Sequence, residues 1–192
     1  MGTGTLATYG RSGDTFRFYE INPAVVHIAR GEGGYFSFLE DSAANIEVAL
    51  GDARLSLQHE LETTGSQAFD MILLDTFSSD SIPIHLLTSQ AFQLYLQHLK
   101  PGGFLAVHIS NIHLDLLPVV FAQARFSGLE CTAIYVGKTN LGSSGSQRVI
   151  LTNDEDILYL PDIQSAVITS EQLPLQVKLW TDDYSNLIQI LR

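Results

Sequence analysis

The sequence predicts an α/β fold built on a mostly parallel, Rossmann-like sheet. Strand-like and helix-like segments alternate along most of the 192 residues, as in chains whose parallel strands are joined by covering helices. Near the C-terminus, two β-rich runs, 129–136 and 148–151, are joined by a short polar connection rich in Gly and Ser. That connection is too short for a crossover helix, so the two runs are expected to pair as an antiparallel hairpin.

The other elements follow from local patterns. Strands are expected where apolar and polar residues alternate, or where a short apolar run is bounded by turns. Helices are expected where apolar residues recur at helical spacing after a polar residue or Pro. The expected strands are 15–20, 45–50, 69–74 and 104–109, and the expected helices are 6–9, 23–30, 54–62, 88–99 and 114–126. The apolar run 69–74 is expected to be buried on both faces, and Leu55, Leu57 and Leu61 are expected to face the core.

Length and composition predict one globular domain over residues 1–192, located in the cytoplasm. Apolar residues make up 45% of the chain and charged residues 16%, which suits a packed core. No apolar run reaches the ~18 residues of a membrane span, and no signal peptide is expected. The single cysteine, Cys131, fits a reducing compartment and is expected to be a buried, unreactive thiol.

Charge and histidine spacing argue against two classes of ligand. The net charge is −11 and the basic residues are scattered, which argues against a nucleic-acid partner. The six histidines lack the spacing of zinc sites, so no metal is expected. His108 falls within the strand 104–109 and is expected to be a packed or hydrogen-bonded core residue.

A glycine-rich loop, Gly2-Thr3-Gly4, stands at the start of the chain. Glycines let a backbone turn tightly and approach a ligand, and such a loop joins a buried strand to a helix in nucleotide-binding folds. Because no strand-like run precedes the loop in this sequence, the first strand, which lies in the middle of such a sheet, is expected to be missing. The chain is then expected to self-associate as a homo-oligomer through that gap, or to be less stable than an extended chain.

Acidic residues follow three of the expected strands. Glu20 ends the strand 15–20, Asp52 follows 45–50, and Asp75 follows 69–74. Ligands of open α/β sheets bind at the carboxyl ends of the strands, so these carboxylates are expected to face one crevice with the glycine loop. Glu20, sixteen residues after Gly4, is placed to accept hydrogen bonds from ribose hydroxyls. Asp52 and Asp75 could instead cap turns or helices, and Asp80 serves either a substrate or a turn.

Taken together, these pieces resemble the spermidine synthase-like (polyamine aminopropyltransferase) family of the class I S-adenosylmethionine-dependent methyltransferase fold. The closing run Leu179-Trp180-Thr181-Asp182-Asp183-Tyr184 is similar to the last motif of the membrane-fused members of that family. The other matching pieces are Gly2-Thr3-Gly4-Thr5, Phe18-Tyr19-Glu20-Ile21-Asn22-Pro23, Gly51-Asp52-Ala53-Arg54, Phe69-Asp70-Met71-Ile72-Leu73-Leu74-Asp75 and Leu99-Lys100-Pro101-Gly102-Gly103.

The resemblance implies transfer of an aminopropyl or methyl group to an amine, such as a putrescine-like polyamine. The donor would be S-adenosylmethionine or its decarboxylated form. The glycine loop would hold the aminopropyl or amino-acid end, Glu20 the ribose, and Asp52 with the Ala53 amide the adenine. Asp75 would orient and deprotonate the amine. The implied cofactor-binding residues are Gly2, Thr3, Gly4, Glu20, Asp52, Ala53 and Asp75, and the implied catalytic residues are Asp75 and Asp80.

The sequence departs from the family at two of these positions. Thr3 stands where the family has an aspartate that contacts the aminopropyl amine, and Asp75 and Asp80 are five residues apart instead of forming D-x-x-D. Together with the missing first strand, these departures leave two alternatives open. One is an S-adenosylmethionine-dependent methyltransferase, and the other is a catalytically degenerate nucleoside-binding domain of a larger membrane-fused protein.

Overall fold

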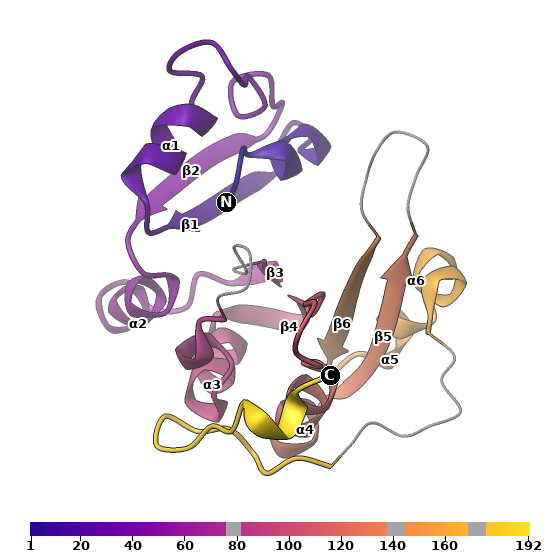
Figure 1. Ribbon diagram of the computed structural model, residues 1–192. Coiled ribbons are helices and arrows are strands. Elements are labelled where there is room, and N and C mark those ends of the chain that lie inside the picture. Colours follow the sequence, from indigo (N-terminus) through magenta and orange to yellow (C-terminus); the bar gives the residue numbers. More distant parts are fainter. Residues whose placement is uncertain (76–81, 138–144, 169–175) are drawn as a thin grey trace. The chain divides into compact units, whose positions relative to one another are not determined.

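The computed structural model describes residues 1–75, 82–137, 145–168 and 176–192. The chain divides into two compact units, Met1–Thr63 and Thr64–Arg192, and each unit has its own sheet (Figure 1). The first sheet has two strands, and the second has four. The α/β class predicted from the sequence is confirmed. The organisation of the whole chain as a single domain stays a prediction.

The first unit is a parallel β-α-β segment preceded by a short helix. Its elements are the 3₁₀ helix Thr5–Tyr9, β1 (Thr15–Glu20), α1 (Pro23–Ala29), β2 (Asn45–Leu50) and α2 (Ala53–Thr63). The two strands pair in parallel register, with Thr15 opposite Asn45 and Glu20 opposite Leu50. Asn22 caps α1 because its side-chain oxygen accepts a hydrogen bond from the Ala24 amide at 3.0 Å. These elements lie where the sequence predicted them.

The core of the first unit lies on one face of β1. Phe18 is buried there with Ala7, Ala29 and Leu39. On α2, Leu57 is buried as predicted, whereas Leu55 is 67% exposed, so its predicted inward orientation was wrong. Residues two apart on a helix are about 200° apart, and therefore Leu55 and Leu57 cannot face the same side.

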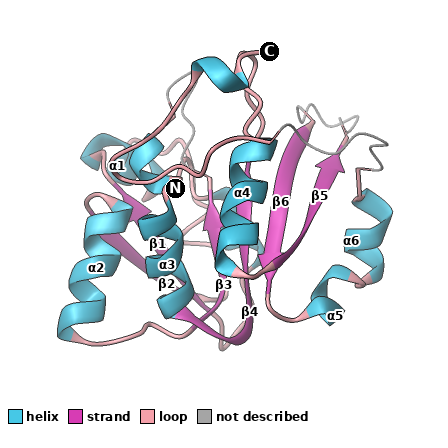
Figure 2. Ribbon diagram, turned by 90° about the horizontal axis from the view of Figure 1, so that it is seen from below, coloured by secondary structure: helices cyan, strands magenta, loops and turns pink. Residues whose placement is uncertain are grey.

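The second unit contains the remaining strands and most of the helices (Figure 2). Its strands are β3 (Phe69–Leu74), β4 (Leu99–His108), β5 (Glu130–Val136) and β6 (Ser146–Thr152). Its helices are the 3₁₀ helix Ile84–Leu86, α3 (Ser89–His98), α4 (Leu117–Ser127), α5 (Glu155–Leu158), α6 (Pro161–Ala166) and the 3₁₀ helix Ile188–Ile190. In the part of the chain that the structure describes, no helix is long and apolar enough to cross a membrane.

The sheet of the second unit combines parallel and antiparallel pairing. β4 pairs in parallel with β3 and antiparallel with β6, and β6 pairs antiparallel with β5. The predicted C-terminal hairpin is therefore confirmed, with β6 on the inner side, next to β4. The prediction that 69–74 is buried on both faces was wrong, since Asp70 is exposed and Met71 is 45% exposed. In the described sheet β3 has one neighbouring strand, and an edge position leaves part of its surface uncovered.

The C-terminal motif anchors the tail of the chain to α3 and α4. Trp180 is 1% exposed, and the fully buried amide of Gln123 on α4 donates two hydrogen bonds of 2.9 Å, to the carbonyls of Trp180 and Leu87. Thr88 caps α3 and donates a hydrogen bond to a carboxylate oxygen of Asp182 at 2.7 Å. The motif at the end of the chain thus has a structural role in the second unit.

Candidate functional site

The glycine loop lies beside the carboxyl end of β1 in the first unit. Gly2 and Gly4 have φ values of +57° and +84°, in the left-handed region that favours glycine. A Cβ at Gly4 would come within 2.5 Å of a methyl group of Leu39, so the loop packs too closely for a larger residue. The amino group of Met1 is 3.4 Å from Oε2 of Glu20. The loop and the predicted ribose-binding carboxylate are therefore neighbours.

Glu20 and Asp52 come together where β1 and β2 end. The backbone carbonyl of Glu20 accepts a hydrogen bond from the Gly51 amide at 2.8 Å, which joins the two strand ends. The Glu20 side chain is 14% exposed, and its Oε1 accepts a hydrogen bond from the Asn22 amide at 2.9 Å. Oδ1 of Asp52 accepts a hydrogen bond from the Leu55 amide at 3.0 Å, so Asp52 has the helix-capping role that the sequence left open.

Thr3 and Ala53 complete the predicted residues of the first unit. The hydroxyl groups of Thr3 and Thr5 are 2.9 Å apart, so Thr3 brings a neutral hydrogen-bonding group to the loop. Ala53 is the first residue of α2, and the amides of a first helical turn have no acceptor within the helix. Carboxylates that accept hydrogen bonds and amides that donate them are the groups that a ribose and an adenine ring require. The chemistry at this end of β1 and β2 therefore fits a nucleoside.

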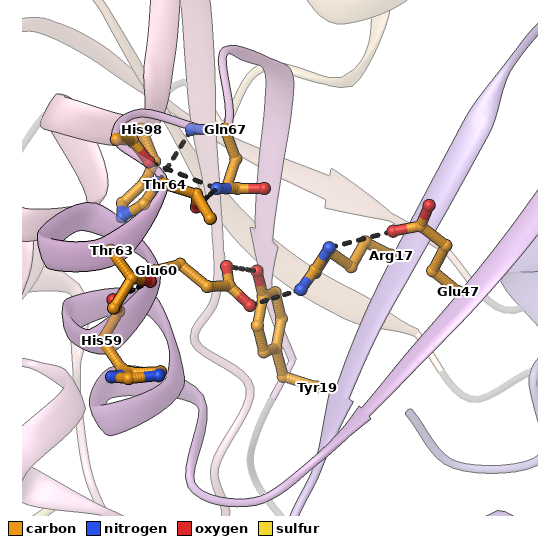
Figure 3. Close-up of polar contacts among 10 residues, drawn as sticks. Arg17, Tyr19, Glu47, His59, Glu60, Thr63, Thr64, Gln67 and His98 are labelled. Carbon is orange, nitrogen blue, oxygen red and sulfur yellow. Dashed lines mark hydrogen bonds and ion pairs between the residues drawn. The ribbon is translucent and has the colours of Figure 1, made fainter.

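A polar network fixes α2 against β1 and β2 (Figure 3). Arg17 on β1 donates hydrogen bonds to Glu47 on β2, at 3.0 Å, and to Glu60 on α2. The Tyr19 hydroxyl donates to the other oxygen of Glu60 at 2.6 Å. Burial, together with the hydrogen bond to Glu60, raises the pKa of Tyr19, which stays a neutral donor. This network holds α2, and with it Asp52, in a defined position within the first unit.

The second unit contributes Asp75, which directly follows β3. Its Oδ1 accepts a hydrogen bond of 2.7 Å from Nδ1 of His108, the last residue of β4. The Asp75 side chain is 45% exposed, whereas that of His108 is 19% exposed. The hydrogen bond from His108 lowers the pKa of Asp75 below its ordinary value although partial burial opposes it, and the charge of Arg148 acts with His108. Asp75 is therefore a half-exposed carboxylate at neutral pH.

Asp75, His108 and Arg148 form a row across β3, β4 and β6. Leu74, the residue before Asp75, is paired with Val107, the residue before His108. His108 is in turn directly opposite Arg148 on β6, so their side chains point to the same face of the sheet. The row places the Asp75 carboxylate next to an imidazole, with a guanidinium beyond it, at the end of the parallel pair.

The sequence analysis did not place His108 in the site. It expected His108 to be a packed or hydrogen-bonded residue of the core. A signal for this role does exist in the sequence. Both parallel strands are apolar runs that end in a titratable residue, Leu73-Leu74-Asp75 and Ala106-Val107-His108. The carboxyl ends of neighbouring parallel strands meet at one edge, so two such residues can contact each other.

Two parts of the predicted site remain predictions. Asp80 lies outside the described residues. The single crevice predicted to contain Glu20, Asp52 and Asp75 draws on both units, each of which is described by itself.

Two other groups were considered as reactive or ligating centres. Burial raises the pKa of the Cys131 thiol to about 11, with a smaller effect from Glu130, which fits the predicted unreactive thiol. Across the described ranges, no three His, Cys, Asp or Glu side chains gather in a group that could hold a metal ion.

Solved structures with a related backbone include a methyltransferase and spermidine synthases. The O-methyltransferase from Bacillus cereus in complex with SAH is 20% identical, with a TM-score of 0.48, over 79% of this chain and 71% of that chain. Spermidine synthase from Thermotoga maritima is 15% identical, with a TM-score of 0.48, over 72% of this chain and 44% of that chain. A spermidine synthase in complex with the transition-state analogue AdoDATO is 15% identical, with a TM-score of 0.47, over 87% of this chain and 53% of that chain.

The sequence itself matches a curated protein. No family model matches the chain. A probable polyamine aminopropyl transferase of Bifidobacterium longum (strain NCC 2705) is 29% identical over 119 residues. The match covers 58% of this chain and 23% of the relative's length. The resemblance predicted from the sequence motifs is confirmed, and the chain is similar over more than half of its length to a polyamine aminopropyl transferase.

Proposed function

We propose that this chain is a transferase that moves an aminopropyl or methyl group from a sulfonium nucleoside to an amine. The observation that carries the proposal is the Asp75 carboxylate, which His108 holds at the carboxyl end of a parallel strand. A carboxylate in this position suits a cationic amine. The similarity to a probable polyamine aminopropyl transferase supports the same reaction class.

The first unit would bind the nucleoside. The Glu20 carboxylate would accept hydrogen bonds from the ribose hydroxyls, and Asp52 with the Ala53 amide would bind the adenine. Gly2, Thr3 and Gly4 would lie against the amino-acid or aminopropyl end. The nucleoside, S-adenosylmethionine or its decarboxylated form, supplies the electrophilic carbon when it is bound.

Asp75 would act on the acceptor. A primary alkylamine is mostly protonated at neutral pH and has no lone pair for attack in that form. Once the amine is neutral, its nitrogen attacks the carbon attached to sulfur, the carbon–sulfur bond breaks, and the bonding electrons stay on sulfur. Positive charge thereby moves to the nitrogen, where the Asp75 carboxylate stabilises it, and the product leaves as a secondary ammonium ion that keeps its protons. Alignment of the two reactants would provide much of the remaining rate.

A thermal-shift panel tests the nucleoside part of the proposal. Its ligands are S-adenosylmethionine, decarboxylated S-adenosylmethionine, methylthioadenosine and NAD. We expect the adenosyl sulfur compounds to raise the melting temperature, because a ligand at 100 times its Kd stabilises the folded state by about 2.7 kcal/mol. NAD should have little effect. If none of the adenosyl compounds shifts the melting of folded protein at millimolar concentration, the proposal is wrong.

The choice between the two transferred groups depends on Thr3. Its hydroxyl lies 2.9 Å from that of Thr5 and offers no negative charge to an aminopropyl amine. This observation favours methyl transfer as the second candidate. A nucleoside-binding domain without turnover, within a larger membrane-fused protein, is the third. For the first candidate, the aminopropyl transferase, we propose a putrescine-like acceptor and a cytoplasmic location.

A further inference from the structure

We propose that His108 is a positioning residue, which holds Asp75 so that Oδ1 faces the imidazole and Oδ2 faces the acceptor amine. This inference rests on the proposed function. It assigns a role to a residue for which the sequence motifs suggested none, and it divides the work of the two carboxylate oxygens. Three observations carry it, namely the hydrogen bond between the residues, the burial of the imidazole and the register of the strands.

The hydrogen bond determines which carboxylate oxygen remains for the amine. Nδ1 of His108 lies 2.7 Å from Oδ1 of Asp75. An ionised carboxylate can only accept, so the imidazole donates through Nδ1–H. With Oδ1 engaged in this way, Oδ2 is the oxygen left to bind the ammonium or the developing charge on the amine. A half-exposed aspartate without this bond would sample several side-chain rotamers.

The burial of His108 indicates that it acts through Asp75. The side chain is 19% exposed, and its Nε2 atom is shielded from solvent. An acceptor amine that reaches the half-exposed carboxylate from solvent therefore meets Asp75, and the imidazole lies behind it. The ring has a fixed place because its strand is central in the sheet, with β3 on one side and β6 on the other.

The register explains why the orientation is reproducible. Val107 is fixed opposite Leu74 by the parallel pairing, so the next residues of both strands, His108 and Asp75, are neighbours. On the other side of His108 lies Arg148, which donates a hydrogen bond to the Ser146 hydroxyl at 2.7 Å. The charged or titratable groups of the described neighbouring strands that act on Asp75 are therefore His108 and Arg148.

The experiment combines a direct titration of Asp75 with steady-state kinetics. The variants are His108→Ala, which removes the donor, and His108→Gln, whose amide can still donate to Asp75. His59→Gln, at an exposed position on α2, is the control for loss of a histidine elsewhere. The carboxyl carbon of Asp75 is followed by NMR as a function of pH, and transfer to putrescine is measured with decarboxylated S-adenosylmethionine and S-adenosylmethionine. Circular dichroism confirms that each variant is folded.

We expect His108→Ala to raise the titration midpoint of Asp75 and to lower kcat/KM for the acceptor by about 10- to 100-fold, with unchanged nucleoside affinity. His108→Gln should recover part of both effects, and the control should match the wild type. An unchanged midpoint, or a kcat/KM within twofold of the wild type, would overturn the proposal. If the midpoint rises but the wild type forms no product, the proposed function is wrong and the positioning role is wrong with it, while the pairing of the two side chains stands.

Discussion

Nδ1 of His108 lies 2.7 Å from Oδ1 of Asp75, and this hydrogen bond joins the carboxyl ends of two parallel strands. Its consequence is a carboxylate with a lowered pKa, mainly through the hydrogen bond from His108. Because the pKa in the folded state is depressed, the stabilisation from this pair is present above the ordinary carboxyl pKa of 3.8 and is lost as the pH falls through the folded-state value. At neutral pH the group is ready to bind a cation.

Substitutions at Asp75 and Glu20 should separate acceptor binding from nucleoside binding. Asp75→Asn should abolish transfer and leave nucleoside affinity nearly unchanged, because the carboxylate is assigned to the amine. Glu20→Ala should weaken nucleoside binding by roughly 1.5–3 kcal/mol, the value of a hydrogen bond to a charged group. Calorimetry with methylthioadenosine measures the nucleoside affinity of each variant. The rate at which the product of the transfer reaction forms measures its turnover.

Wild-type turnover in Asp75→Asn would show that the acceptor carboxylate is misassigned. Unchanged affinity in Glu20→Ala would do the same for the ribose contact. Glu32→Ala is a suitable control, because this exposed carboxylate pairs with His27 and lies outside the candidate site.

Transfer should become faster as the pH rises. An alkylamine has a pKa of about 10.4, so moving its proton to an aspartate with an ordinary or lower pKa costs roughly 9 kcal/mol or more. Drawing the neutral amine from solution at pH 8 costs only about 3 kcal/mol. The acceptor should therefore react from its neutral form, and kcat/KM for the acceptor should rise by about tenfold per pH unit from pH 6.5 to 9. A flat profile over this range would instead indicate that the bound ammonium loses its proton to the enzyme.

The stability of the second unit should depend on Gln123. Its buried amide donates to the carbonyls of Leu87 and Trp180, so Gln123→Ala removes two buried hydrogen bonds, although the Trp180 carbonyl keeps the one that it accepts from the Ser89 amide. We expect a loss of about 2–4 kcal/mol in the free energy of unfolding, measured by urea denaturation. Gln97→Ala removes a comparable amide at an exposed position of α3 and should change stability by less than about 0.5 kcal/mol. Equal effects of the two substitutions would mean that the buried amide does not anchor the tail.

Self-association should occur through an open strand edge. In the described sheets β1 pairs only with β2, and β3 pairs only with β4. Such edges are templates for pairing with another chain. Sedimentation velocity should detect a species of about twice the 21.1 kDa chain mass, and added salt should favour it by screening the net charge of −11. A single monomeric species at all protein and salt concentrations would contradict this prediction.

Local sequence patterns predicted most of the secondary structure, because alternation and helical spacing depend on neighbouring residues. The acidic strand ends were also predictable, since the carboxyl ends of parallel strands bind ligands. For the contact between Asp75 and His108, the titratable strand ends give only a general signal. Which two residues meet depends on the register of the strands, and these residues are 33 apart in the sequence. The exposure of Met71 likewise depends on which strands flank β3, and local periodicity carries no information about strand order.

Product analysis tests the central claim most directly. The protein is incubated with putrescine and either S-adenosylmethionine or its decarboxylated form, and the released nucleoside is identified by mass spectrometry. Release of methylthioadenosine indicates aminopropyl transfer, and release of S-adenosylhomocysteine indicates methyl transfer. We predict that one of these products forms only in the presence of the acceptor and is absent with Asp75→Asn. If neither product forms with any amine tested, although calorimetry shows that the nucleoside binds, the chain is a nucleoside-binding domain and not a transferase.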